Sequence, residues 1–372
     1  MATILVIASL PSSLVNFRGP LIEDMIARGH VVHAAGPACD AATAQWLRDR
    51  SVDYHAVEMA RTALSPRLDV RTLQQLRAHM RAIRPDVVFA YTIKPVIYGM
   101  LAASLAGVQR RYALVTGLGY AFTDGDRSAK RRITQAIASS LYAVALRRAS
   151  GVFFQNPDDA ALFAKMRLLP RRIAPVIVNG SGVDVAAYAP APLPAAPRFL
   201  MIARLVADKG VREFIAAARI VKAQRPDALF QLVGPADPNP AAISPALIPD
   251  AVADGVIEYP GAAKDVRPFI AQCSVYVLPS YREGTPRTVL EAMAMGRPVV
   301  TTDAPGCRET VADGDNGLLV PPRDAQSLAH ALLRMADDGA MRARMGQRAR
   351  TLCMEKYDVH KVNAAMLDAM RL

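Results

Sequence analysis

Two carboxylates, Glu283 and Glu291, lie eight positions apart in a stretch that could bind a nucleotide. Glu283 follows an apolar run, Val275 to Leu278, that is typical of a buried parallel strand. We therefore expect Glu283 on the loop at the carboxyl end of that strand, where open α/β sheets bind ligands. Glu291 falls in the helix expected next, among apolar residues, where an unpaired carboxylate would be costly. The paired hydroxyls of a ribose would supply the donors that Glu291 needs.

The helix expected after Glu283 should begin at a point that favours an anion. Thr285 can cap this helix and Pro286 suits its first position. The free backbone N–H groups would then face the same crevice, and a diphosphate binds well at such a point. The alternative interpretation makes Glu283 a solvated loop residue and Glu291 a core carboxylate satisfied by the backbone.

Two cations, Arg204 and Lys209, could neutralise a diphosphate without a metal ion. Arg204 follows the strand expected over Phe199 to Ala203, and Lys209 comes just before Gly210 and an expected helix. Cations at the carboxyl end of a strand are well placed for a ligand bound there. The alternative is an ordinary loop with two solvated cations.

A longer motif surrounds these residues. From Glu283 the chain reads Glu-Gly-x-Pro-x-x-x-Leu-Glu-Ala-Met-Ala-x-Gly-x-Pro-Val-Val, and Gly-Cys-Arg-Glu follows at 306–309 and Asp-Gly-Asp-Asn-Gly-Leu-Leu-Val-Pro at 313–321. This closely resembles the donor half of the family-4 retaining glycosyltransferases, and the resemblance runs over essentially the whole chain. It implies an α/β protein with the GT-B fold, in which two Rossmann-like domains with parallel sheets face a central cleft.

The resemblance also implies roles for the donor-half residues. Arg204-Leu-Val-Ala-Asp-Lys209-Gly210 matches the family pattern in which the Arg and Lys hold the nucleotide diphosphate. It implies that Glu291 binds the ribose and that Glu283 acts on the donor sugar, with uridine near 256–261. The implied catalytic residues are Glu283, Arg204 and Lys209, and the remaining donor-binding residues of this half are Gly284, Thr285, Pro286 and Glu291.

The first loop, Ser9 to Gly19, indicates the stereochemistry. It contains no His or Asp, the usual base in inverting enzymes of this fold. That favours retention of the donor's anomeric configuration. In such a reaction, an oxygen of the donor phosphate takes the proton of the acceptor. Family members bring a Gly-rich turn of this loop against the donor phosphate, and Gly19 is the matching residue.

Candidate contacts to the acceptor or the sugar lie near strand ends in the N-terminal half. Thr92-Ile-Lys-Pro and Thr116-Gly-Leu-Gly together resemble a bacterial subgroup that adds sugars, often N-acetylhexosamines, to polyprenyl-diphosphate-linked glycans. Many family members carry a His near Thr116 that contacts the donor sugar, and this chain has none there. The alternative for Lys94 is a surface cation at a helix start. The candidate contacts are Arg18, Thr92, Lys94, Thr116 and Gly117.

Other short motifs are better explained as turns. Asp124-Gly-Asp126 and Asp313-Gly-Asp315 are similar to a metal-binding motif of another glycosyltransferase fold, but both are rich in turn residues. Thr116-Gly-Leu-Gly lacks the third glycine of a dinucleotide fingerprint. We therefore expect no metal site and no cofactor, with the nucleotide sugar bound as a substrate.

Apolar runs typical of strands alternate with helical patterns, as in parallel α/β sheets. Four prolines in residues 188–197 interrupt the pattern. We predict an N-terminal domain over 1–185, a linker over 186–197 and a second domain over 198–357, and the resemblance implies that a final helix over 358–372 joins the first domain. Strands are expected over Ile4–Ala8, Val31–Ala35, Tyr54–Val57, Val87–Tyr91, Tyr112–Val115, Val152–Gln155, Val176–Val178, Phe199–Ala203, Phe230–Val233, Val256–Tyr259, Val275–Leu278, Val299–Thr302 and Leu318–Val320.

The net charge of +12 belongs mostly to the N-terminal half. Up to Val185 there are 23 Lys and Arg against 13 Asp and Glu, whereas the remainder has 22 against 20. Such basic faces suit an anionic membrane surface, and the alternative is a solvated, arginine-rich helix surface. We find no nucleic-acid recognition motif. Without a signal peptide, a membrane-spanning run or a disulfide pattern, we expect a cytoplasmic protein, peripheral on the inner face of the cell membrane.

Together with the resemblance, these observations predict a metal-independent, retaining glycosyltransferase. It would move a hexose or N-acetylhexosamine from a UDP-sugar to a polyprenyl-diphosphate-linked sugar in capsule, O-antigen or related glycan synthesis. One alternative is a nucleotide-sugar 2-epimerase of the same fold, which would release UDP without an acceptor. A second is a non-catalytic nucleotide-sugar-binding subunit, against which the complete set of Arg204, Lys209, Glu283 and Glu291 argues.

Overall fold

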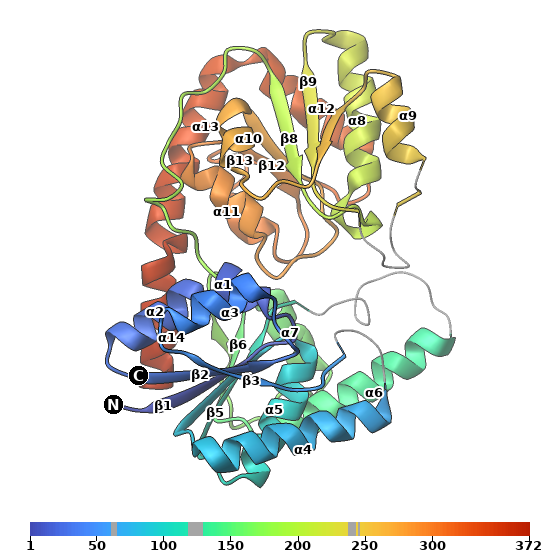
Figure 1. The fold of residues 1–372 in the computed structure, drawn as a ribbon. Helices are drawn as coiled ribbons and strands as arrows, with labels where there is room; N and C mark the ends of the chain where they lie inside the picture. Colours follow the sequence, from blue (N-terminus) through green and yellow to red (C-terminus); the bar gives the residue numbers. More distant parts are fainter. Residues whose placement is uncertain (61–64, 118–128, 237–242, 245) are drawn as a thin grey trace. The chain divides into compact units, whose positions relative to one another are not determined.

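The chain folds into two compact units. The computed structural model describes residues 1–60, 65–117, 129–236, 243–244 and 246–372 (Figure 1). Unit 1 comprises Met1–Ser181 and His360–Leu372, and unit 2 comprises Gly182–Val359. Part of the Thr116 motif, Leu118 and Gly119, and the Asp124-Gly-Asp126 motif lie outside the described residues.

Unit 1 is built on a parallel sheet of seven strands, in the order β3-β2-β1-β4-β5-β6-β7. The strands are β1 (Thr3–Ile7), β2 (Val31–Gly36), β3 (Asp53–Ala56), β4 (Val87–Tyr91), β5 (Arg110–Val115), β6 (Gly151–Phe154) and β7 (Val176–Ile177). The helices are α1 (Ser12–Asn16), α2 (Gly19–Ala27), α3 (Ala41–Arg48), α4 (Pro66–Ile83), α5 (Ile93–Leu105), α6 (Ala129–Leu146), α7 (Pro157–Lys165) and α14 (Val359–Met370).

Helices cover both faces of this sheet, which is why its central strands are apolar on both sides. Leu5 and Ile7 of β1 belong to one core, with residues of α4, α5, α6 and α7, whereas Ile4 and Val6 belong to the other, with residues of α1, α2 and α14. Figure 1 shows these two helical layers around the sheet. The chain order reverses between β1 and β4, so the loops after these strands meet at the switch point of the sheet.

The C-terminal helix completes the second of these cores. Val362, Met366, Leu367 and Met370 of α14 are buried in it. The Nδ2 of Asn363 also donates to the Oδ2 of Asp24 over 2.7 Å. The last helix of the chain therefore packs in the unit that contains its N-terminus (Figure 1).

Unit 2 has a parallel sheet of six strands, in the order β10-β9-β8-β11-β12-β13. The strands are β8 (Arg198–Ile202), β9 (Leu229–Val233), β10 (Glu258–Gly261), β11 (Val275–Leu278), β12 (Val299–Thr302) and β13 (Gly317–Val320). The helices are η2 (Ala207–Lys209), α8 (Val211–Gln224), α9 (Leu247–Ala253), α10 (Arg267–Gln272), α11 (Arg287–Ala294), η3 (Arg308–Thr310), α12 (Ala325–Asp337), α13 (Gly339–Leu352) and a π-helical turn, η4 (Cys353–Tyr357). No helix in the described part of either unit is long and apolar enough to cross a membrane.

One predicted strand is misplaced. We expected a strand over Val256–Tyr259, but β10 begins at Glu258. The N–H groups of Val256 and Ile257 bond to the carbonyl of Ala251, at the end of α9, over 2.9 and 3.3 Å. These two apolar residues therefore close the helix, and only the following residues pair with β9.

The segment predicted as a linker, residues 186–197, is part of unit 2 in the structure. The buried guanidinium of Arg297 donates to the carbonyl of Pro192 over 3.1 Å, and that of Arg342 donates to the carbonyl of Ala195 over 3.2 Å. Buried guanidinium groups need acceptors, and this segment supplies them from its backbone. The boundary between the units therefore falls after Ser181, and the proline-rich segment is part of the second unit.

Candidate functional site

The candidate site lies at the switch point of the unit 2 sheet, between the loops after β8 and β11. These strands are neighbours, and the chain order of the sheet reverses between them. Arg204, which is exposed, follows β8, and Glu283 lies on the loop after β11. This is the place where open α/β sheets bind their ligands.

Lys209 and Glu283 form an ion pair in this site. The Nζ of Lys209 lies 2.5 Å from the Oε1 of Glu283, and the two side chains are 21% and 12% exposed. The partners are separated by 74 positions, so the fold creates this pair. It places a cation and a carboxylate together at a partly open position, where each can still reach a ligand.

The short helix that carries Lys209 is tied to the β11 loop. The carbonyl of Asp208, in η2, accepts from the hydroxyl of Ser280 over 3.0 Å and from the N–H of Tyr281 over 2.9 Å. Gly210 ends η2 with a φ of +76°, and a Cβ there would lie 2.0 Å from the carbonyl oxygen of Pro279. A glycine is therefore required at this close approach of the two loops.

A second glycine supports Glu283 from the other side. The N–H of Glu283 donates to the carbonyl of Pro305 over 2.9 Å. Gly306 has a φ of +82°, and a Cβ there would lie 2.2 Å from the carbonyl oxygen of Glu283 and 2.6 Å from that of Gly284. The Gly-Cys-Arg-Glu motif thus packs directly against the backbone that presents Glu283.

Glu291 is buried on α11, and two donors from the described part of the chain reach it. The hydroxyl of Tyr188 and the Nε of Arg287 each lie 2.9 Å from its Oε1. Burial raises the pKa of Glu291, and the charge of Arg287 and the hydrogen bonds from Tyr188 and Arg287 oppose that rise. The sequence prediction that a ribose must supply the donors was therefore incomplete. Within the described residues, the hydrogen bonds to Glu291 both reach Oε1, so Oε2 keeps its capacity to accept.

Helix α11 begins one residue later than predicted. Its first residue is Arg287, and Pro286 is the N-cap, with an extended ψ of 106° and no side-chain cap. The carbonyl of Pro286 accepts from the N–H groups of Val289 and Leu290 over 3.1 and 3.3 Å. Thr285 is therefore not the cap residue, although the helix still begins on the same loop, after Glu283 and Gly284.

The predicted residues of the first loop of unit 1 have packing roles. Arg18 is 2% exposed, and its guanidinium lies over the ring of Tyr91, 5.2 Å from the centroid. Gly19 is buried, and a Cβ there would lie 3.1 Å from the ring of Trp46. These contacts explain why both residues suit the fold. Their predicted contacts with substrate remain predictions.

Thr92 and Lys94 lie at the start of α5. The hydroxyl of Thr92 lies 2.8 Å from that of Ser9, which joins the loops after β1 and β4. Lys94 is not the surface cation of the alternative interpretation, because it is 6% exposed and pairs with Asp69 over 2.7 Å. Thr116 and Gly117 follow β5, and both are partly exposed. For these four residues, the predicted contact with acceptor or sugar remains a prediction.

Asp313-Gly-Asp315 forms a turn before β13. The Oδ1 of Asp313 accepts from the N–H of Leu319 over 2.9 Å, and Asp315 pairs with Arg348 over 3.0 Å. Gly314, between them, has a φ of +79°. The two carboxylates thus have structural partners, as the turn interpretation requires.

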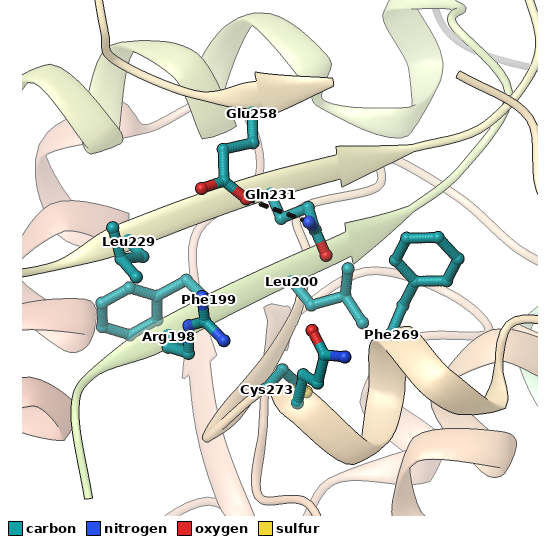
Figure 2. Close-up of a pocket in the computed structure, with 9 residues that line it drawn as sticks. Arg198, Phe199, Leu200, Leu229, Gln231, Glu258, Phe269 and Cys273 are labelled. Atoms are coloured by element: carbon teal, nitrogen blue, oxygen red, sulfur yellow. Dashed lines mark hydrogen bonds between the residues drawn. The ribbon is translucent and has the colours of Figure 1, made fainter. Parts of the chain in front are cut away.

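A small cavity in unit 2 lies away from this site. Figure 2 shows Arg198, Leu229 and Glu258 around it, and these are the first residues of β8, β9 and β10. Its volume is about 10 Å³, which is room for about one water molecule. The cavity is therefore at the amino end of the strands, and the ion pair of Lys209 and Glu283 is at the carboxyl end.

Two residues important to the site were missed by sequence reasoning. Tyr188 was assigned to a linker, and Arg287 was not selected from the motif. Tyr188 is 103 positions from Glu291, so no local pattern could indicate the contact. The sequence could have indicated Arg287, since it precedes Glu291 by four positions, the spacing of a helical ion pair.

Comparison with known proteins places both halves of the chain in glycosyltransferase families. Residues 18–180 match the model described as glycosyl transferase 4-like domain, and residues 196–338 match the model described as glycosyl transferases group 1. Each matched region lies within one of the two structural units.

Curated relatives and solved structures agree with these matches. The chain is 28% identical to an N,N'-diacetylbacillosaminyl-diphospho-undecaprenol α-1,3-N-acetylgalactosaminyltransferase of Campylobacter jejuni, over 91% of this chain and 90% of that protein. It is 26% identical to a UDP-Gal:α-D-GlcNAc-diphosphoundecaprenol α-1,3-galactosyltransferase of Escherichia coli, over 79% and 77% of the two chains. The fold matches that of a sucrose-phosphate synthase from Thermosynechococcus elongatus, with a TM-score of 0.82, 19% identity and coverage of 100% and 98%.

The predicted fold class is therefore confirmed as GT-B, with two parallel α/β units. The chain belongs to the glycosyltransferases that combine a 4-like domain with a group 1 domain.

Proposed function

We propose that this glycosyltransferase moves a hexose or N-acetylhexosamine from a UDP-sugar to a polyprenyl-diphosphate-linked sugar, with retention and without a metal ion. The observation that carries the proposal is the ion pair of Lys209 and Glu283 at the switch point of the unit 2 sheet, close in sequence to Arg204. It supplies a cation for a phosphate and a carboxylate for a sugar at adjacent positions.

Arg204 and Lys209 bind the diphosphate of the donor. At an effective dielectric constant of about 20, each cation placed about 4 Å from a phosphate oxygen contributes about 4 kcal/mol of gross attraction. This attraction grows as the diphosphate leaves with its additional negative charge, so the two cations stabilise the transition state more than the bound substrate. The role that a divalent cation plays in other transferases is then filled by protein side chains.

The two glutamates divide the recognition of nucleoside and sugar. Glu291 presents Oε2 to the ribose hydroxyls, while Tyr188 and Arg287 hold its Oε1. Glu283 faces the sugar, where its charge stabilises the positive charge that develops at the anomeric carbon. Uridine lies near residues 256–261, which include β10.

Retention follows from the chemistry available in the first loop. Residues 9–19 contain no His or Asp to take the proton of the acceptor. In the proposed step, the bond between the anomeric carbon and the diphosphate breaks, and the acceptor oxygen attacks from the same face. Its proton goes to the departing phosphate oxygen, so the diphosphate is both leaving group and base.

The proposed substrates are supported by the names of two relatives. Both carry a diphospho-undecaprenol-linked sugar in their names, and one also carries UDP-Gal. A lipid-linked acceptor resides in a bilayer, so the enzyme would act at a membrane surface. Thr92, Thr116 and Gly117 at strand ends of unit 1, together with Arg18 and Lys94, are the proposed contacts to acceptor or sugar.

The test is a transfer assay with a panel of UDP-hexoses and UDP-N-acetylhexosamines and a short-chain, detergent-soluble polyprenyl diphosphate sugar. We expect a disaccharide product with the donor's anomeric configuration by NMR, and undiminished turnover in EDTA. An inverted product would contradict retention, and activity restored only by magnesium or manganese would contradict the metal-independent reaction. UDP release without acceptor, together with a free sugar inverted at C2, would identify an epimerase instead.

A further inference from the structure

The outer face of α6 exposes an apolar stripe. Ile133, Ile137 and Val144 are 61%, 43% and 45% exposed. At 100° per residue, these three side chains point within an arc of about 40° along about 16 Å of helix. The helix is part of the layer that packs on α5 in unit 1 (Figure 1). Single exposed apolar residues are ordinary, but a helical stripe of them indicates a contact surface.

The segment around this stripe is strongly basic. Residues 127–183 contain ten Lys and Arg against two acidic residues, Asp158 and Asp159. Both acidic residues lie in the first turn of α7, and Asp159 is buried. Most of the net charge of the chain, +12, is therefore concentrated in the segment that contains α6 and α7.

A hollow lined by arginines lies at the C-terminal end of the stripe. Arg147, Arg167 and Arg171 line it, with Leu168 and Leu169 among its apolar walls, and its volume is about 330 Å³. In the described part of the chain, the side chains of these three arginines have no carboxylate partner. Three like charges around one hollow repel one another unless an anion lies between them.

These arginines are not required to cap the helices. Arg172 donates to the carbonyls of Arg147 and Ala149 over 2.6 and 3.1 Å, and Arg111 donates to that of Arg148, so the end of α6 already has its donors. The end of α7 is closed by its own backbone, since the N–H of Leu168 bonds to the carbonyl of Phe163 over 2.9 Å. The ordinary structural role of arginines at helix ends is thus filled by other groups.

We propose that this face docks on an anionic phospholipid bilayer, with the α6 stripe in the interface and a lipid phosphate in the arginine hollow. Apolar side chains beside cations are the combination that binds a helix in the plane of an anionic membrane. A second copy of the chain fits less well, because it would bring a second arginine cluster against the first. The inference deepens the proposed function, since a lipid-linked acceptor lies in such a bilayer, but the binding test below needs no transfer.

The experiment measures binding of the full chain to vesicles by co-sedimentation. Vesicles of phosphatidylcholine alone are compared with vesicles that also contain phosphatidylglycerol, at low and physiological salt. Two variants test the surface: Ile133→Gln with Ile137→Gln, and Arg147→Ala with Arg171→Ala. Their matched controls in unit 2 are Val252→Gln, which is also exposed, on α9, and Arg334→Ala, an exposed arginine at the end of α12.

We expect binding to the anionic vesicles that weakens with salt, and controls that bind as the wild type does. Each arginine near the surface should contribute about fivefold, so the double arginine variant should bind more than tenfold more weakly. The isoleucine variant should also bind more weakly but keep the same dependence on salt. Thermal melts establish that the variants are folded.

Three outcomes would overturn the proposal. These are equal binding to both kinds of vesicle, variants that bind as the controls do, and self-association of the wild type that the isoleucine variant abolishes. Transfer to the detergent-soluble acceptor separates this proposal from the proposed function. The docking variants should keep that activity, whereas an inactive wild type that still binds vesicles would count against the proposed function alone.

Discussion

Glu283 and Glu291 belong to one loop and helix, yet their surroundings differ. Glu283 is partly exposed and pairs with Lys209, a cation that a diphosphate would also attract. Glu291 is buried, and its two donors in the described structure, Tyr188 and Arg287, bond to the same oxygen, Oε1. The first carboxylate is therefore able to respond to a bound ligand, whereas the second is fixed before the ligand arrives.

Gly306 allows a direct test of how the loop positions Glu283. The change Gly306→Ala would place a Cβ 2.2 Å from the carbonyl oxygen of Glu283, at a φ of +82°. The loop must then move, so we expect turnover to fall at least about 100-fold and the free energy of unfolding to fall by about 2–4 kcal/mol. Initial rates and urea unfolding measure the two effects.

Gly314 provides the matched control for this prediction. It has nearly the same φ, +79°, but a Cβ there would have no neighbour within 4 Å. Gly314→Ala should therefore cost only about 1 kcal/mol of backbone strain and leave turnover unchanged. Equal losses of turnover in the two variants would show that strain, and not the position of Glu283, explains the effect.

At the scale of elements, three histidines from β2, β3 and α4 form a cluster that the sequence did not indicate. The rings of His33 and His55 lie 5.4 Å apart, those of His55 and His79 lie 5.1 Å apart, and Asp53 lies beside His33. Burial and the charges of the two other imidazoles lower the pKa of His55 below its ordinary value, and Asp53 opposes this. The cluster depends on strand register and helix packing, neither of which periodicity reveals.

This cluster predicts how stability depends on pH. The folded chain binds a proton at His55 less readily than the unfolded chain, whose pKa is about 6.5. The stabilisation is therefore fully present above about pH 6.5 and is lost as the pH falls through the lower folded pKa. Melting curves from pH 8 to pH 5 should show this loss, and His55→Gln should reduce it. The exposed His330 serves as a control, and a slope that His330→Gln changes as much as His55→Gln would contradict the prediction.

Most elements could be predicted because their signals are local. Strands over Val87–Tyr91, Val275–Leu278 and Val299–Thr302 coincide with β4, β11 and β12, since short apolar runs of β-branched residues are typical of strands buried on both faces. The start of β10 could not be predicted, because Val256 and Ile257 instead close α9 through bonds to Ala251. In that case a helix end and a strand start compete for the same apolar residues.

The candidate site likewise contains residues that a local signal predicts and residues that only the fold brings together. Glu283, Lys209 and Arg204 were predicted from their motif and from their places after strands, and the fold brings the first two into contact. Tyr188 could not be predicted, because prolines around it are typical of a linker and its partner is distant in the chain. The burial of Lys94 was also missed, since its partner, Asp69, lies on another helix.

At the scale of the whole molecule, the core of unit 1 is completed by the last helix of the chain. Met366 on α14 is fully buried in the core that Trp46 borders, and Trp46 is the one tryptophan in the sequence. Trp46 fluorescence therefore gives a signal for unit 1, and UDP binding gives one for the proposed site in unit 2.

We expect Met366→Ala to lower the free energy of the fluorescence-detected unfolding by about 2–5 kcal/mol, because it leaves a cavity in this core. UDP affinity of the folded variant, measured by calorimetry, should stay unchanged. Met335→Ala removes an equally buried methionine from the core of unit 2 and is the matched control. Met335→Ala should leave the unfolding transition detected by Trp46 fluorescence unchanged. If Met335→Ala shifted that transition as much as Met366→Ala, the two units would unfold together.

The most direct test of the central claim is calorimetric UDP affinity, measured together with initial transfer rates, for Glu283→Gln and Glu291→Gln. Glu283→Gln removes the charge beside the sugar and leaves Lys209 for the diphosphate, so turnover should fall while UDP affinity stays near that of the wild type. Glu291→Gln should weaken UDP by about 1.5–3 kcal/mol, the contribution of a hydrogen bond to a charged group. With melts that show both variants folded, the reverse pattern would exchange the two roles, and full binding and turnover in both variants would contradict the assigned site.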